Sequence, residues 1–165
     1  MNKVISKIEA KRRGYIKDEN GNYRKSTVLE KYLKEGYLHL PNSTFSDEDR
    51  KRVGERLAYD YYMGNFGRIR SVNIAEIRTG TRGSEGLDNS LVFRERFLRA
   101  AQSIPYEFWP YVRQVCIDNK EIKGDLSIPQ KGLRNKNSIY YKKMLLNLGL
   151  ERLVKHYLQK NKKSS

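Results

Sequence analysis

The sequence of 165 residues contains few of the side chains that build catalytic, metal and disulfide sites. Its single cysteine, Cys116, excludes an internal disulfide and is typical of a protein from a reducing cytoplasm. The only other common zinc ligands of this type are two histidines, His39 and His156, so no standard zinc-ligand set can be assembled. No serine stands with an obvious base, and no carboxylate pair has a spacing that suggests acid–base catalysis. We therefore expect no catalytic residue, no metal and no cofactor, and the chain is predicted not to be an enzyme.

Long apolar runs are also lacking. No stretch approaches the length of a membrane span, and no signal peptide opens the chain. The Gly-rich stretch 64–86 does not contain the phosphate-binding pattern GxxxxGK[ST]. We therefore expect a cytoplasmic, nucleoid-associated protein with no membrane partner and no small-molecule substrate.

Positive charge is what the chain has in excess. It holds 34 Lys and Arg against 19 Asp and Glu, a formal net charge of +15. Residues 105–165 hold 13 of these cations against 5 acids, whereas residues 46–104 hold 11 against 9. Excess charge of this sign is informative about partners and favours nucleic acid. The simpler alternative is a basic surface that only faces water.

The chain divides into three segments of a mainly α-helical small domain. Residues 1–45 are predicted as a flexible basic N-terminal arm with a turn at 18–22 and a short helix closed by Gly36. Residues 46–104 are predicted as a helical support region around the Gly-rich loop 64–86. Residues 105–160 are predicted as a helix-turn-helix-like DNA-binding region. Glycine and proline at 124, 129 and 132 limit any helix inside the connector before the last helix to one or two turns.

The helix starts carry specific signals. Ser46 followed by Asp49 has the spacing of a capping box, which predicts a helix over about 47–63. A second helix is predicted over 91–101, and Pro105 is placed as the first residue of the next. Pro110 follows five residues later, so the alternative is that this helix kinks or begins there. Cys116 lies on the apolar face of that third helix, which predicts a buried structural thiol.

The last helix is predicted to have two different halves. Asn137 or Ser138 is expected to cap its start. An apolar line predicted to pack in the core follows, and Tyr140, Tyr141 and Met144 point away from it. The members of this line are Ile139, Leu146, Leu150, Leu153 and Tyr157. One half fixed in a core and one half free is what a recognition helix needs.

The predicted DNA contact set lies at the front of this helix. Ser138 and the free N–H groups of the helix start are expected to hold a phosphate, and lysines supply charge. Asn137, Tyr140 and Tyr141 are candidates for base edges or sugars, although Tyr141 could instead pack against a neighbouring element. Arg78 and Arg82 of the Gly-rich loop are secondary candidates. The full set is Lys131, Arg134, Lys136, Asn137, Ser138, Tyr140, Tyr141, Lys142 and Lys143.

Three stretches also resemble a known family: 46–61 (SDEDRKRVGERLAYDY), 112–122 (VRQVCIDNKEI) and 138–158 (SIYYKKMLLNLGLERLVKHYL). Their order resembles region 4 of sigma factors and related helix-turn-helix modules. More narrowly, it resembles an alphaproteobacterial family that includes the C-terminal domain of the gene-transfer-agent activator GafA and phage-type regulators. The resemblance implies a sigma-like activator of phage or phage-derived genes that binds promoter DNA and engages RNA polymerase. The longer activators carry a separate N-terminal DNA-binding domain, for which residues 1–45 are too short.

These observations favour a regulator of transcription that binds double-stranded DNA. Three alternatives stay open at this point. The exposed tyrosines and Met144 could instead form a surface for RNA polymerase, as in an antitermination or accessory protein. They could stack on unpaired bases of RNA. Carboxylates distant in sequence could converge into a small nuclease site.

Overall fold

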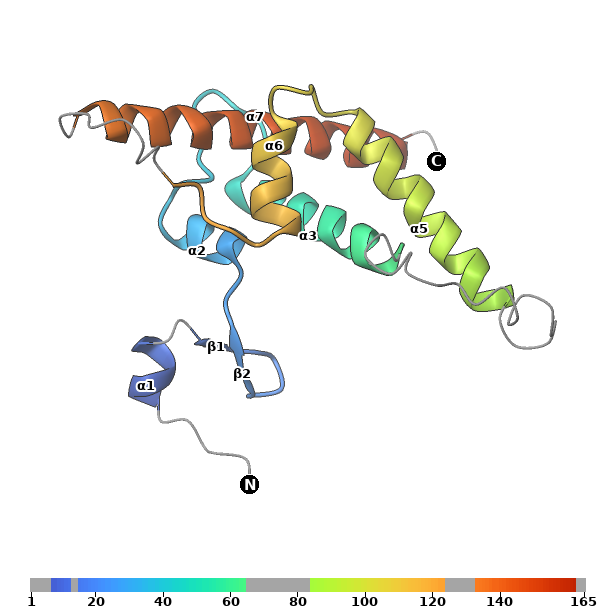
Figure 1. The fold of residues 1–165 in the computed structure, drawn as a ribbon, viewed down its shortest axis with the longest axis horizontal. Coiled ribbons are helices and arrows are strands. Elements are labelled where there is room, and N and C mark those ends of the chain that lie inside the picture. Colours follow the sequence, from blue (N-terminus) through green and yellow to red (C-terminus); the bar gives the residue numbers. More distant parts are fainter. Residues whose placement is uncertain (1–6, 13–14, 65–83, 124–132, 163–165) are drawn as a thin grey trace.

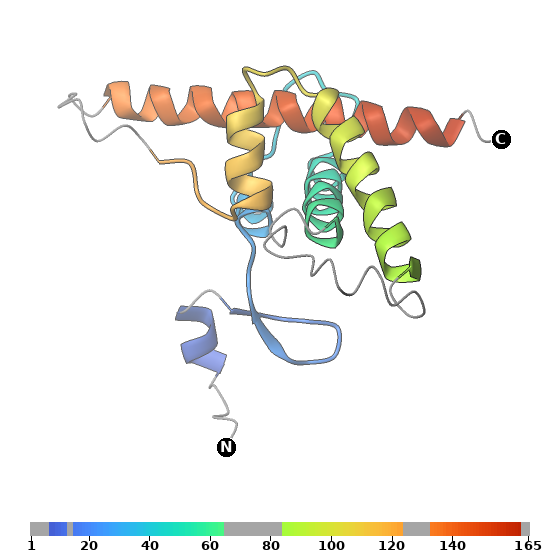
Figure 2. The ribbon, with the colours of Figure 1, turned by 45° about the vertical axis from the view of Figure 1, so that its right-hand side comes forward.

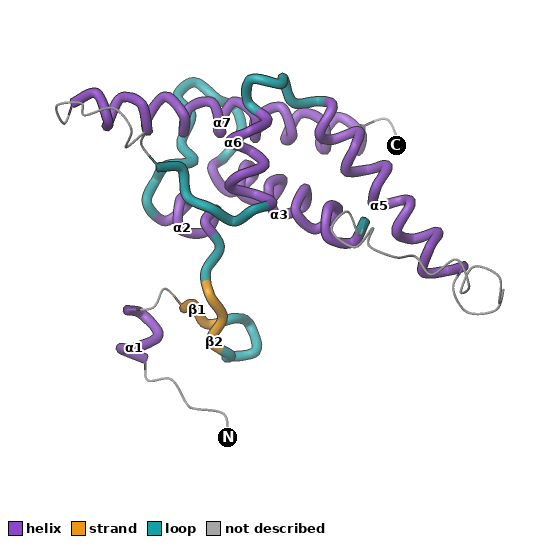
Figure 3. Tube along the Cα trace, viewed as in Figure 1, coloured by secondary structure: helices purple, strands orange, loops and turns teal. Residues whose placement is uncertain are grey.

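The structure is a computed structural model that describes residues 7–12, 15–64, 84–123 and 133–162. It is mainly helical, as predicted, and Figure 3 shows that the strands of the described part lie in one N-terminal hairpin. The helices are α1 (Lys7–Arg12), α2 (Val28–Lys34), α3 (Asp47–Met63), α5 (Ser84–Gln102), α6 (Trp109–Val112) and α7 (Leu133–Lys162). A π-helical turn, η1 (Arg113–Ile117), continues α6. None of the described helices has the length and apolar character that a bilayer crossing requires.

The N-terminal segment contains a β-hairpin that the sequence did not predict. β1 (Tyr15–Lys17) pairs antiparallel with β2 (Tyr23–Lys25). The predicted turn joins them: the Asp18 side chain accepts hydrogen bonds from the backbone N–H groups of Asn20 and Asn22. Gly21 supplies the positive φ of 81° that the turn requires. Strands of three residues are too short to show an alternating pattern in the sequence.

α3 begins and ends where the sequence predicts, and α2 ends at its predicted glycine. Ser46 and Asp49 form a complete capping box at the start of α3, which ends at Met63. Thr27 and Glu30 form a second capping box at the start of α2. Gly36 follows α2 with a φ of +75°, which confirms its predicted role at the helix end.

The predicted helix bounds were wrong elsewhere. α5 begins at Ser84, seven residues before the predicted start at 91. The next helix does not begin at Pro105 but at Trp109, with Pro110 in its first turn, which agrees with the alternative start at Pro110. It then widens into η1, where the Asp118 N–H donates to the carbonyl of Arg113.

α7 lies along one side of the molecule, and α3, α5 and α6 pack against it from the same side (Figures 1 and 2). Leu146, Leu150 and Leu153 of α7 are fully buried, and Cys116 lies in the same core, as predicted. Residues of α2 and the segment after it, among them Tyr32 and Leu38, belong to this core as well. The hairpin and α1 lie away from α7. The core therefore fixes the middle and C-terminal part of α7.

Candidate nucleic-acid interface

The N-terminal half of α7 leaves the core and presents aromatic groups to solvent. Tyr140 is 67% exposed, Tyr141 58% and Met144 44%, as the helical pattern predicts. One turn further on, Leu145 and Leu146 are buried. Figures 1 and 2 show the first turns of α7 extending beyond α6 and α2. The exposed front and buried back expected of this helix are therefore present, and Tyr141 does not pack against a described neighbour that covers it.

Lys142 and Lys143 differ although they are adjacent. The Lys143 Nζ lies 3.2 Å from the ring centroid of Tyr37 and 5.0 Å from that of Tyr32. Burial against these rings lowers the pKa of Lys143, while Glu35 and Glu121 oppose the shift. Lys142 is half-buried and has no ion pair with a described carboxylate. Lys142 is thus the better placed of the two for a phosphate, because the Lys143 ammonium already occupies an aromatic site.

The predicted start of the last helix was wrong. α7 begins at Leu133, so Asn137 and Ser138 lie inside its first turns instead of capping it. No glycine or proline separates Leu133 from Ser138, so no local signal stops the helix from extending back to the residue after Gly132. The free N–H groups therefore belong to the first residues of the helix, near 133. The Ser138 N–H lies beyond them, where backbone N–H groups donate to carbonyls of the same helix. The expected phosphate site on Ser138 and free N–H groups is not formed at that residue.

Several predicted contact residues fall outside the description. Lys131 lies in 124–132, and Arg78 and Arg82 lie in 65–83, so none of the three is described. The side chains of 133–138 are likewise outside the described residues, although the backbone there is helical. They include Arg134, Lys136, Asn137 and Ser138. Residues 118–132 separate η1 from α7 and are described only to Lys123, so the helix-turn-helix stays a prediction.

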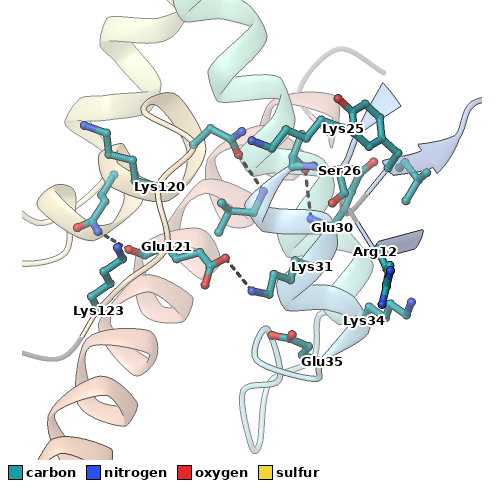
Figure 4. Close-up of a pocket in the computed structure, with 16 residues that line it drawn as sticks. Arg12, Lys25, Ser26, Glu30, Lys31, Lys34, Glu35, Lys120, Glu121 and Lys123 are labelled. Carbon is teal, nitrogen blue, oxygen red and sulfur yellow. Dashed lines mark hydrogen bonds and ion pairs between the residues drawn. The ribbon is translucent and has the colours of Figure 1, made fainter. Parts of the chain in front are cut away.

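A second basic surface, which the sequence did not predict, lies beside α2. A groove of about 1140 Å³ runs over this helix between the N-terminal hairpin and residues 118–123. Figure 4 shows Lys120 and Lys123 on the side of that segment, Arg12 and Lys25 on the side of the hairpin, and Lys31 of α2 between them. The lining residues come from two distant regions of the sequence, 12–35 and 114–123, which is why no local pattern indicates the groove.

The segment 118–123 is held against α2 by a series of hydrogen bonds. Asn119, with a φ of +50°, accepts from the N–H of Val28 through its Oδ1 at 2.8 Å. The Ile122 N–H donates to the buried Tyr32 hydroxyl at 2.8 Å. Lys31 Nζ pairs with Glu121 Oε1 at 2.7 Å. Because the backbone is fixed in this way, the exposed lysines at 120 and 123 project from a defined support.

Two ionisable side chains in the core, Cys116 and Asp60, have pKa values that burial raises. Burial raises the pKa of the Cys116 thiol to about 12, so this sulfur stays protonated and is a poor nucleophile. Burial also raises the pKa of Asp60, which contacts Arg96 and Tyr157. No group of three or more described His, Cys, Asp or Glu side chains is arranged to hold a metal ion.

Comparison with known proteins finds no family model, no curated protein and no solved structure that matches this chain. The resemblance to sigma region 4 and to the gene-transfer-agent activators therefore stays a prediction.

Proposed function

We propose that this chain is a DNA-binding regulator of transcription, of the sigma-like kind that its sequence resembles, and that the N-terminal half of α7 is its contact surface. The observation that carries the proposal is the division of α7 into two halves. Leu146 to Tyr157 provide the buried half, and Tyr140, Tyr141 and Met144 stand on the exposed half. Basic residues accompany the exposed half in the sequence. A single α-helix fits the major groove of B-DNA, which is about 12 Å wide.

Each of the groups on this half of α7 has a role in the proposal. Lys142 neutralises a phosphate, and Arg134 and Lys136, about two turns earlier on the same helix, extend the charge along the strand. The exposed rings of Tyr140 and Tyr141 contact sugars or base edges. Lys143 serves mainly to hold α7 against α2, because its ammonium lies on the Tyr32 and Tyr37 rings.

The test changes charge on the two halves of the same helix. K136Q/K142Q removes two cations from the front, and R152Q/K155Q removes two exposed cations from the C-terminal half. Binding to random duplex DNA is measured by fluorescence anisotropy at several salt concentrations. We expect the front variant to lower the slope of log K against log salt by about 2, at roughly 0.9 per phosphate contact. The C-terminal variant is expected to keep the wild-type slope, and equal slopes for both variants would place the DNA elsewhere.

A second function is favoured by the same exposed groups. Tyr140, Tyr141 and Met144 are residue types enriched in the centres of protein interfaces. In this alternative α7 binds RNA polymerase, and DNA binding is weak and unspecific. Y140A/Y141A separates the two functions: loss of polymerase capture with unchanged duplex affinity supports the protein interface.

A further inference from the structure

We infer that the groove over α2 binds the phosphodiester backbone of the same DNA and fixes its position next to α7. This inference rests on the proposed function and adds a second contact surface to it. Contacts of this kind set register and orientation on a duplex without reading its sequence.

The charge balance of the groove favours a polyanion. Six lysines and arginines line it against three glutamates, Glu30, Glu35 and Glu121. Glu30 is neutralised by Arg24, which is not a lining residue, through two contacts at 2.5 and 3.1 Å. Glu121 is paired with Lys31. The groove therefore presents four net positive charges, and only Glu35 of its glutamates has no ion pair with a described residue.

The cations that remain are exposed and available. Lys25, Lys34, Lys120 and Lys123 form no ion pair with any carboxylate in the described part of the chain. They stand on three different supports, the hairpin, α2 and the segment 118–123, so they surround the groove instead of forming one row. A phosphodiester strand that lies in the groove meets these lysines in succession, and each contact releases condensed counterions.

The form of the groove also favours an extended ligand over a small one. Its volume of about 1140 Å³ lies above the range of roughly 300–1000 Å³ that is common for small-molecule sites. Two of the three lining carboxylates, Glu30 and Glu121, are paired with Arg24 and Lys31, so Glu35 is the lining carboxylate left to oppose a phosphate. Because the segment 118–123 is hydrogen-bonded to α2 before any ligand binds, little ordering is needed at that side of the groove.

The groove is close enough to α7 for one duplex to contact both. α2 contacts both: its Tyr32 ring meets Lys143 of α7, while its Lys31 and Lys34 line the groove. An α-helix with its side chains is about 10–12 Å across, close to the width of the major groove. When α7 lies in the major groove of a duplex, we expect a phosphate strand that borders this major groove to reach the protein groove lined by Lys31 and Lys34 of α2.

The test compares two variants of equal net charge. K25Q/K34Q/K120Q/K123Q removes four cations of the groove, and R52Q/R113Q/R152Q/K155Q removes four exposed cations outside it. For random duplex DNA we expect the groove variant to lower the salt slope by about two to three and to lose at least about tenfold in affinity at 0.15 M salt. The control variant keeps a slope close to that of the wild type.

The outcomes separate this inference from the proposed function. If the groove variant keeps the wild-type slope while K136Q/K142Q lowers it, DNA binds through α7 alone and the groove inference is overturned. If the wild type does not bind duplex DNA at low salt, the proposed function fails, and the inference that rests on it fails as well.

A positional test does not depend on charge removal. Because Cys116 is buried, a single cysteine introduced by K120C can carry a photo-crosslinker, and K155C serves as the control. Crosslinking of duplex DNA to position 120 and not to position 155 is expected. Equal or absent crosslinking at position 120 would contradict the placement of the strand in the groove.

Discussion

At the scale of single residues, the fold depends on a few charged side chains that are buried together with their partners. Arg50 of α3 is 1% exposed and donates to the Leu38 carbonyl at 2.7 Å and to Glu151 of α7 at 3.0 Å. It also contacts Asp47 and Ser43. One guanidinium thus joins α3, α7 and the segment that connects α2 to α3.

Removal of Arg50 is predicted to cost more than removal of an exposed arginine. R50L leaves the half-buried Glu151 without its cation, and loss of one partner of a buried pair costs about 3–5 kcal/mol. We expect the free energy of unfolding, measured in urea, to fall by about 3 kcal/mol in R50L. The double variant R50L/E151L is expected to recover part of this loss, and R52Q serves as the exposed control. Equal stability of R50L and R52Q would contradict the account.

Asp60 gives a prediction for pH. Its carboxylate is fully buried, and burial raises its pKa, while Arg96 and Arg56 and the Tyr157 hydroxyl oppose the shift. The folded state therefore binds a proton more readily than the unfolded state. This contribution to stability is complete below the ordinary aspartate value of 3.8 and is lost as the pH rises through the raised pKa.

D60N cannot titrate at this position, so the difference between the two proteins isolates Asp60 from the other carboxylates. We expect the unfolding free energy of the wild type to increase relative to D60N as the pH falls from 7 towards 3.8. Urea unfolding of both proteins across this range measures the effect. A relative decrease would mean that the Arg96 ion pair outweighs burial.

Lys142 and Lys143 allow two roles to be separated on adjacent residues. K143Q is predicted to lower stability by about 1 kcal/mol, because its contact with the Tyr32 and Tyr37 rings is lost, and to leave the salt slope of DNA binding unchanged. K142Q is predicted to change stability by less than about 0.5 kcal/mol and to lower the slope by about 1. Urea unfolding and anisotropy measure the two effects. Exchange of the two results would show that Lys143 leaves the rings to bind DNA.

At the scale of elements, α6 and α7 approach each other closely at a glycine. A Cβ at Gly149 would lie 2.5 Å from Val112 Cγ2 and 3.2 Å from Phe108 Cβ. A larger residue at position 149 would push α6 away from α7. The absence of a side chain at Gly149 therefore allows the two helices to lie this close together.

G149A is therefore predicted to destabilise the protein although alanine favours helices by about 1 kcal/mol over glycine. Overpacking against Val112 should lower the unfolding free energy by about 2 kcal/mol. V112A/G149A is expected to lose less than the sum of the single variants, because the alanine methyl fills part of the space that valine vacates. Additive losses would contradict a direct contact.

The sequence predicted the elements whose ends depend on local chemistry. The capping box at Ser46 and the glycine after α2 identified their helix ends, since each signal acts within a few residues. The start of α7 could not be found in this way, because Asn137 and Ser138 are good N-cap residues that a longer helix can also contain. The π-helical turn after α6 likewise has no signal in the sequence.

The candidate interface was predictable only in part, because only some of its features depend on residues that are close in sequence. The outward position of Tyr140, Tyr141 and Met144 follows from helical spacing, and the structure confirms it. The capture of Lys143 by Tyr32 and Tyr37 requires contacts across more than a hundred residues of sequence. The groove over α2 likewise depends on residues 12–35 and 114–123, two distant regions of the sequence that meet only in the folded chain.

At the scale of the whole molecule, one core supports two candidate surfaces, the exposed front of α7 and the groove over α2. The buried half of α7 fixes its exposed half, and the hydrogen-bonded segment 118–123 fixes one side of the groove. The formal net charge of +15 attracts a polyanion to the molecule from a distance, and these two surfaces define where it is expected to bind.

The central claim is that this chain binds duplex DNA through phosphate contacts. The most direct test is the affinity of the wild-type protein for random duplex DNA at 50 and 200 mM salt, measured by fluorescence anisotropy. For four phosphate contacts the account predicts a loss of affinity of about a hundredfold between these concentrations. Affinity that does not change with salt, or no binding at 50 mM salt, would contradict it.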